Sequence, residues 1–421
     1  MSERDLSVVV LGATGVTGRR VAAYLAERAA EVGATWAAAG RDPGKVERVL
    51  AEVGIEPPEV LVADVSDPAS LAAMASRTRV VLDLVGPYTL YGEPVIKACV
   101  AAGAHYVDLS GEIPFARRMI DAYHERAAAA GVKVVEVCGF EALPPDLSVL
   151  LAAETARERW DEALAEVDLD IATRQPSGRL RLEDLMSGGT MQSMAEATGG
   201  EDAELVVDPA ALVTDPDAAA AIRRRSPIEL APRVNSRGDA IAPMSPAAFI
   251  NPAVIQRTAA LLAAERGDGA EPPRYREGIA IPGGSASLPL RYAAAGALAG
   301  MQAGFRSLSR ARPSVRRRSA ALMRRAFPGS GFGPKEKLDQ WSWMLTLDAR
   351  TVGGHNLRVE LDADGHPGYL TTATMLGEVG LLLAEDGATP QRAGCLTPAT
   401  ALGTGCLDRL ARAGARFRLA S

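Results

Sequence analysis

The chain has 421 residues, of which 48% are hydrophobic and 5% aromatic, and its formal net charge is -6 at pH 7. This length suits two or three structural units with aliphatic cores, and the charge balance argues against nucleic acid as a partner. The four scattered cysteines and four histidines fit neither a disulfide framework nor a metal site. The charged first residues lack a signal-peptide core, which predicts a cytoplasmic protein.

Strand and helix patterns alternate through the first 150 residues. Apolar strands are predicted at 8–11, 35–39, 60–65, 80–85, 105–108 and 133–137, and helices at 18–30, 45–53, 93–102 and 114–130. Strands that are apolar throughout must be covered on both faces. The pattern therefore predicts an α/β fold, with a Rossmann-type doubly wound parallel sheet over residues 1–150.

A glycine loop follows the first predicted strand, in the stretch VVVLGATGVTGRR at 8–20. Glycines between a strand and a helix let the backbone approach a pyrophosphate, which the helix N-terminus favours. We therefore expect the loop to bind a dinucleotide through Gly12, Ala13, Thr14, Gly15, Val16, Thr17, Gly18 and Arg19. A tight turn without a ligand is the alternative. A phosphate-transfer loop is disfavoured because no Gly-Lys-Ser/Thr follows.

The residues after the second and third strands help to distinguish NADP from NAD as the bound dinucleotide. Arg41 directly follows the second strand, where an arginine accommodates the 2′-phosphate of NADP. The sequence therefore favours NADP(H). In the alternative, Arg41 is a solvated turn residue and Asp42 binds the ribose of NAD. Asp64, which ends the third strand, is predicted either to contact the adenine or to cap the next helix.

The carboxyl ends of the fourth and fifth strands supply the candidate catalytic residues. Ligands of such sheets bind along this edge. Three residues of the fourth strand end are therefore expected beside the nicotinamide ribose: Val85, Gly86 and Pro87. By position alone, the candidate catalytic groups are Tyr88, Tyr91 and Glu112. Glu112 is equally compatible with a helix cap.

Several motifs carry a family resemblance. LGATGVTGR, LVGPYTLYGEPVIKACVAAGAHYVDLSGE and CGFEALPPDL resemble saccharopine dehydrogenase-like oxidoreductases. MSGGTMQSM at 186–194 and the segments at 368–384 and 394–410 are similar to the bacterial branch that includes the trans-acting enoyl reductases. The resemblance implies an NADPH-dependent oxidoreductase that reduces the C=C bond of an apolar enoyl substrate, such as a carrier-bound polyketide or lipid.

The sequence departs from the family pattern at one motif. Where relatives have GFDSxPxDL, this chain places Glu141 and Ala142 at the Asp-Ser pair, which keeps a carboxylate and loses a hydroxyl. A saccharopine-type imine or amino-acid oxidoreductase is the alternative enzyme. It is disfavoured because no conspicuous arginine cluster near the strand ends would bind an amino-acid carboxylate.

The rest of the chain predicts a second, α+β substrate domain over 151–368. A helix is expected at 147–160, and alternating strands at 166–174, 179–185 and in a pair within 337–364. Trp341 and Trp343 share one strand face, in the core or lining an apolar pocket. Helices are expected at 369–385 and 398–413. The resemblance implies that 369–421 returns to the first domain.

An arginine-rich insertion, about 286–330, lies in the second domain. Residues 278–334 contain nine arginines and no acidic residue. Arg291 and Arg306 leave too short an uncharged run to span a membrane. The segment fits peripheral contact with an anionic membrane, docking of an acidic acyl carrier protein, or a solvated helical face. A non-catalytic NADPH-binding protein at a lipid surface is therefore a further hypothesis.

Overall fold

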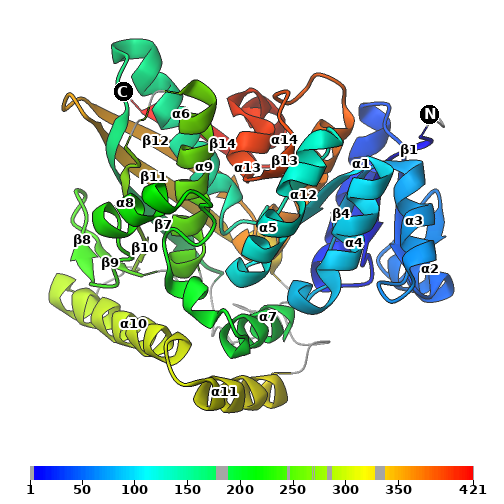
Figure 1. Ribbon diagram of the computed structural model, residues 1–421, viewed down its shortest axis with the longest axis horizontal. Coiled ribbons are helices and arrows are strands. Elements are labelled where there is room, and N and C mark those ends of the chain that lie inside the picture. The colour runs from blue at the N-terminus through cyan, green and yellow to red at the C-terminus, as the bar shows by residue number, and fades with distance from the viewer. Residues whose placement is uncertain are drawn as a thin grey trace.

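The computed structural model describes residues 4–176, 188–243, 247–267, 269, 271–281, 287–327 and 337–420 (Figure 1). In these ranges the chain forms two seven-stranded sheets. One hydrophobic core runs between them, because it contains Val8 and Val10 of the first sheet as well as Leu345 and Leu347 of the second. The two sheets are therefore packed together rather than joined only by a linker.

The first sheet has the order β13-β6-β5-β4-β1-β2-β3, and all its strand pairs are parallel. Its strands are β1 (Leu6–Leu11), β2 (Trp36–Gly40), β3 (Val60–Val62), β4 (Thr78–Asp83), β5 (His105–Asp108), β6 (Lys133–Val135) and β13 (Gly394–Leu396). The strand order reverses at β1, which lies between β2 and β4. This confirms the predicted doubly wound fold and places the switch point at the glycine loop.

Helices connect these strands: α1 (Val16–Glu31), α2 (Pro43–Ala51), α3 (Pro68–Arg77), α4 (Tyr88–Ala102) and α5 (Ile113–Ala129). Two of them begin with an aspartate cap followed by proline. Asp42 accepts a hydrogen bond from the Lys45 N–H, and Asp67 accepts one from the Ala69 N–H. No range was predicted for α3, although its Asp-Pro start is a helix signal.

The second sheet has the order β14-β12-β11-β7-β10-β9-β8. Only β7 and β10 pair in parallel among its described strands. Its strands are β7 (Leu164–Arg174), β8 (Arg233–Val234), β9 (Ala240–Ala242), β10 (Arg274–Ala280), β11 (Ser342–Thr351), β12 (Asn356–Asp364) and β14 (Ala415–Ala420). The strand predicted at 179–185 lies outside the described residues.

The other α-helices in the described ranges are α6 (Leu143–Trp160), α7 (Gly188–Gly199), α8 (Pro216–Arg225), α9 (Asn251–Arg266), α10 (Leu288–Ser309), α11 (Pro313–Ala326), α12 (Thr372–Ala384), α13 (Pro398–Leu402) and α14 (Leu407–Arg412). Helix α6 packs on β7, β11 and β12 of the second sheet. Most of its residues up to Ala156 are buried, as expected for a helix that is covered on all sides.

The end of the chain contributes to both sheets. Strand β13 pairs with β6 in the first sheet, and α12 packs on α1. The buried Glu378 of α12 accepts hydrogen bonds from Tyr24 and Arg28 of α1 and from Arg409 of α14. Strand β14, which was not predicted, then extends the second sheet beside β12.

Two buried carboxyl groups face each other where β4 and β5 end. Asp83 pairs with Asp108 in the strand register, and the Tyr106 hydroxyl lies 3.2 Å from Asp83 Oδ2 and 2.9 Å from Asp108 Oδ2. Asp83 also accepts the Val85 N–H at 3.0 Å. Burial raises the pKa of Asp83 to about 8 and that of Asp108 to about 7. The pair therefore holds a proton near neutral pH.

We expect Asp83→Asn to flatten the decline of the unfolding free energy as pH rises from about 4 to about 8. The folded state binds this proton more tightly than the unfolded chain. The stabilisation is therefore full below about pH 4 and is lost as pH rises toward about 8. One such group contributes a slope of at most about 1.4 kcal/mol per pH unit. Urea unfolding at several pH values measures this, with the exposed Asp217→Asn as control. An unchanged slope would contradict the assignment.

Candidate nucleotide and substrate site

The glycine loop has a geometry that requires glycine at its first and third positions. Gly12 has a φ of 86°, and a Cβ there would lie 3.0 Å from the Leu84 backbone at the end of β4. A Cβ on Gly18 would lie 2.3 Å from the Gly12 carbonyl oxygen. The loop therefore packs closely against both β4 and the start of α1, which a larger residue would prevent.

The start of α1 has the features of an anion site. Gly15 is its N-cap, no side chain caps it, and its first turn has no acidic residue. Its first N–H groups and the helix dipole therefore favour a pyrophosphate. Of the other predicted loop residues, Ala13 is buried, and Thr14, Val16, Thr17 and Arg19 are half-buried around the helix start. These residues fit the pyrophosphate of a dinucleotide.

Arg41, Asp42 and Asp64 follow the ends of β2 and β3 and have different surroundings. Arg41 is exposed just after β2. Asp42 Oδ1 accepts the Lys45 N–H at 3.0 Å, so its carboxylate caps α2. Hydrogen bonds from Ser66, helped by the positive charge of Arg41, lower the pKa of Asp64. Asp64 does not cap α3, because Asp67 does. Arg41 thus remains available for a 2′-phosphate.

The end of β4 lies between the glycine loop and α7. Val85, Gly86 and Pro87 precede α4, and a Cβ on Gly86 would lie 3.8 Å from Ser193 Oγ of α7. Helix α7 carries the Ser-Gly-Gly-Thr motif of the sequence from Gly188 onward. Helix α7 of the second domain therefore lies beside the end of β4, where the nicotinamide ribose was predicted to bind.

The structure places the three predicted catalytic residues in different surroundings. Tyr88 is buried, and its hydroxyl donates to the Asp83 carbonyl at 3.1 Å. Burial raises the pKa of Tyr88 well above its ordinary value. Glu112 is fully buried, and its two oxygens accept the N–H groups of Tyr88 at 2.9 Å and Thr89 at 2.8 Å. Tyr91 is 39% exposed on α4. Tyr88 and Glu112 thus have structural partners that hold the start of α4.

A further carboxyl group lies at the end of β6. A Cβ on Gly139 would be 2.8 Å from Glu141 Oε2, 3.5 Å from Leu109 and 3.9 Å from the methyl group of Thr372. Burial raises the pKa of Glu141, and only its own backbone N–H opposes the shift. Glu141 was noted in sequence as a retained carboxylate but not as a catalytic candidate. Its position at the carboxyl edge of the sheet now makes it one.

An aromatic contact joins Phe140, the residue before Glu141, to the second domain. The neighbouring Phe140 packs edge-on against Trp343 of β11, with ring centroids 4.8 Å apart. The Phe140 N–H donates to Thr372 Oγ1 at 3.1 Å, and Trp343 Nε1 donates to Thr371 Oγ1 at 3.3 Å. Trp341 instead packs on His366, with ring centroids 4.5 Å apart. Trp343 thus joins the second sheet to the end of β6.

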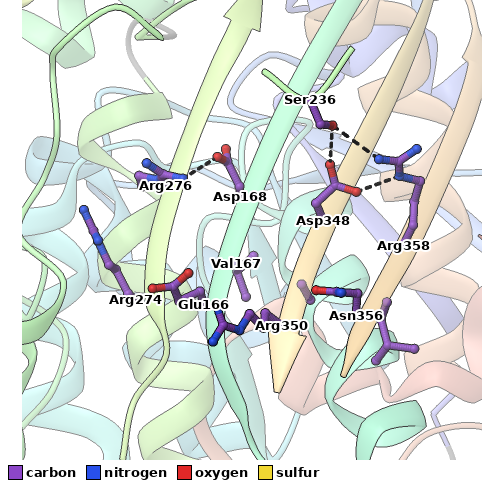
Figure 2. A pocket seen from close by; sticks show the side chains of 12 residues that line it. Glu166, Val167, Asp168, Ser236, Arg274, Arg276, Asp348, Arg350, Asn356 and Arg358 are labelled. Carbon is purple, nitrogen blue, oxygen red and sulfur yellow. Dashed lines mark hydrogen bonds and ion pairs between the residues drawn. The ribbon is translucent and has the colours of Figure 1, made fainter. Parts of the chain in front are cut away.

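A pocket of about 380 Å³ lies elsewhere, on the polar face of the second sheet (Figure 2). Its lining comes from β7, β10, β11 and β12 and from Ser236, and includes no residue of the glycine loop. Asp168 pairs with Arg276 at 2.7 Å, and Asp348 pairs with Arg358 at 2.6 Å. Because these charges compensate one another, we interpret the pocket as part of a structural ion-pair network rather than the reaction site.

Comparison with known proteins agrees with this geometry. Residues 8–135 match the family model of the saccharopine dehydrogenase NADP binding domain. The chain is 35% identical, over 99% of both chains, to a Mycobacterium tuberculosis protein provisionally named a trans-acting enoyl reductase. It is 34% identical to a trans-acting enoyl reductase of Mycobacterium ulcerans, over 98% of this chain and 97% of the relative.

A solved structure supports the fold across nearly the whole chain. Apo saccharopine dehydrogenase (L-Glu forming) from Saccharomyces cerevisiae aligns with a TM-score of 0.51 and 14% identity, covering 98% of this chain and 99% of the other. The family model also confirms the predicted cofactor, NADP(H). The chain therefore belongs to the saccharopine dehydrogenase-like oxidoreductases, together with the trans-acting enoyl reductases, and is an NADP-dependent oxidoreductase.

Proposed function

We propose that this protein reduces the C=C bond of an apolar enoyl thioester. The observation that carries the proposal is that the carboxyl group of Glu141, in the segment after β6, lies in a region of apolar and aromatic side chains. Leu109 and Glu141 both lie close to Gly139, and Phe140, the residue before Glu141, packs against Trp343. An acyl chain gains free energy from contact with such side chains, whereas the charged groups of an amino acid would lose hydration there. The names of the relatives favour the same reaction.

The residues that would hold NADPH are those of the glycine loop, with Arg41 for the 2′-phosphate. When bound, NADPH supplies the hydride that the β carbon of the enoyl group receives. The chain must then protonate the α carbon. Glu141 is our proposed proton donor, because burial raises its pKa and so favours the protonated form needed for donation. Tyr88 and Glu112, in contrast, use their polar atoms to hold the backbone.

The test is NADPH consumption with paired substrates. The purified protein is mixed with NADPH and enoyl thioesters of increasing acyl length, or with an imine formed from an amino acid and a keto acid. We expect kcat/KM to rise with acyl length, since each buried methylene contributes about 0.8 kcal/mol. Turnover of the imine alone would contradict the proposal and favour the amino-acid alternative.

A further inference from the structure

Helices α10 and α11, called here the basic arm, lie along one margin of the molecule (Figure 1). Helix α10 turns one stripe of buried residues toward the body: Ala295, Ala299, Gln302 and Ser309. A second stripe with helical spacing lies on the opposite side: Leu290, Ala294, Ala297 and Met301. Leu290 is 63% and Met301 71% exposed. Helix α10 therefore presents an apolar face to solvent.

The arm also carries a concentrated positive charge. Residues 278–334 hold nine arginines and no acidic residue, in a chain whose net charge is -6. Four arginines anchor the arm. Arg291 pairs with Asp239 at 3.5 Å, and Arg306 donates to the Ile228 carbonyl at 3.5 Å. Arg316 donates to the Gly200 carbonyl at 3.0 Å, and Arg324 pairs with Glu196 at 2.8 Å. Five others are exposed: Arg310, Arg312, Arg317, Arg318 and Arg325. Leu322 lies among them and is 70% exposed.

We propose that the basic arm docks on an anionic lipid surface. An amphipathic helix with apolar and basic groups lies in the membrane interface, with its apolar side in the acyl boundary and its arginines at the headgroups. The two helices have 22 and 14 residues and follow one another along the margin in Figure 1, a length of roughly 50 Å. A planar surface can contact this whole length, whereas a small globular partner covers only part of it.

The arm is fixed to the helix that covers the nucleotide edge. Gln192 Nε2 of α7 donates to the Phe327 carbonyl at 2.6 Å and to the Arg324 carbonyl at 3.2 Å. Its neighbour Ser193 lies near Gly86. No helix among the described residues is long and apolar enough to cross a bilayer, so the arm would lie on the surface. Docking does not depend on which acceptor the enzyme reduces.

Sedimentation of the full chain with vesicles tests the docking. We expect binding to vesicles of phosphatidylcholine with phosphatidylserine, weakening as salt increases, and little binding to phosphatidylcholine alone. The triple variant Arg317→Gln, Arg318→Gln and Arg325→Gln should bind about 100-fold more weakly. A matched control removes three exposed cations elsewhere, with Lys97→Gln, Arg159→Gln and Arg224→Gln, and should bind like the wild type.

Apolar variants separate lipid insertion from simple charge attraction. The variant Leu290→Ser, Met301→Ser and Leu322→Ser should also lose vesicle binding, whereas the exposed pair Val53→Ser and Val352→Ser should not. Equal binding by all variants, or no binding of the wild type to anionic vesicles, overturns the proposal. So does a result in which the arginine variant raises KM only for carrier-bound substrates while vesicle binding is unchanged, since this would assign the arm to a carrier protein.

Discussion

Glu141→Gln is expected to lower kcat for enoyl reduction by about 10²–10⁴-fold, the usual contribution of a positioned general acid. The amide keeps the shape of the side chain beside Gly139 but has no acidic proton to give. NADPH affinity should stay unchanged, because the nucleotide loop is built from other residues. Steady-state rates and nicotinamide fluorescence titration measure the two effects separately.

The pH profile distinguishes proton donation from a structural role. Since burial raises the pKa of Glu141, the wild-type rate should be highest where the carboxyl is protonated and fall as pH rises through that pKa. Glu141→Gln should lose this alkaline limb, and Glu141→Asp should restore part of the rate. Tyr88→Phe is the control, because its hydroxyl bonds to the Asp83 carbonyl. A large kcat loss in Tyr88→Phe, with none in Glu141→Gln, would return the role to Tyr88.

Arg41→Ala is expected to weaken NADPH binding by about 10–100-fold and to leave NADH binding unchanged. A hydrogen bond to a charged group contributes about 1.5–3 kcal/mol, and NADH lacks the 2′-phosphate that receives it. Fluorescence titration with both cofactors gives the ratio of dissociation constants.

Lys45→Ala is the matched control, because it removes an exposed cation from the adjoining helix α2. It should change the NADPH and NADH constants by the same small factor. Equal weakening of both cofactors in Arg41→Ala would contradict a 2′-phosphate contact. Arg19, half-buried at the glycine loop, would then be the next residue to test.

Local sequence signals predicted the nucleotide half of the molecule. At Gly12 and Gly18 the neighbouring backbone is too close for a side chain. A glycine motif in the sequence indicates such close backbone contacts. Six of the seven strands of the first sheet were predicted from their apolar sequences, whereas β13 was not predicted. The bounds of α3 were not predicted, although Asp67 and Pro68 mark its start. Here the signal was present in the sequence and was not used.

The surroundings of the candidate substrate site depend on contacts between distant residues. Phe140, the residue before Glu141, donates its N–H to Thr372 and packs on Trp343, both about two hundred positions later in the chain. The backbone contacts of Glu112 with Tyr88 and Thr89 likewise join two strand ends. Strand β14 pairs with β12, about sixty positions earlier in the chain. Periodicity and motifs do not encode such pairings, so the structure was needed to place them.

In the proposed reaction the protein transfers hydride from NADPH to an enoyl group. The most direct measurement is mass spectrometry of the product formed from NADPH deuterated at nicotinamide C4 and a long-chain enoyl thioester. The two cofactors that carry deuterium on opposite faces of C4 are tested separately. One of them should give a saturated thioester with one deuterium at the β carbon, and the other should give a saturated thioester without deuterium. A protein that binds NADPH tightly yet forms no saturated, deuterated thioester from either would contradict the proposed reaction.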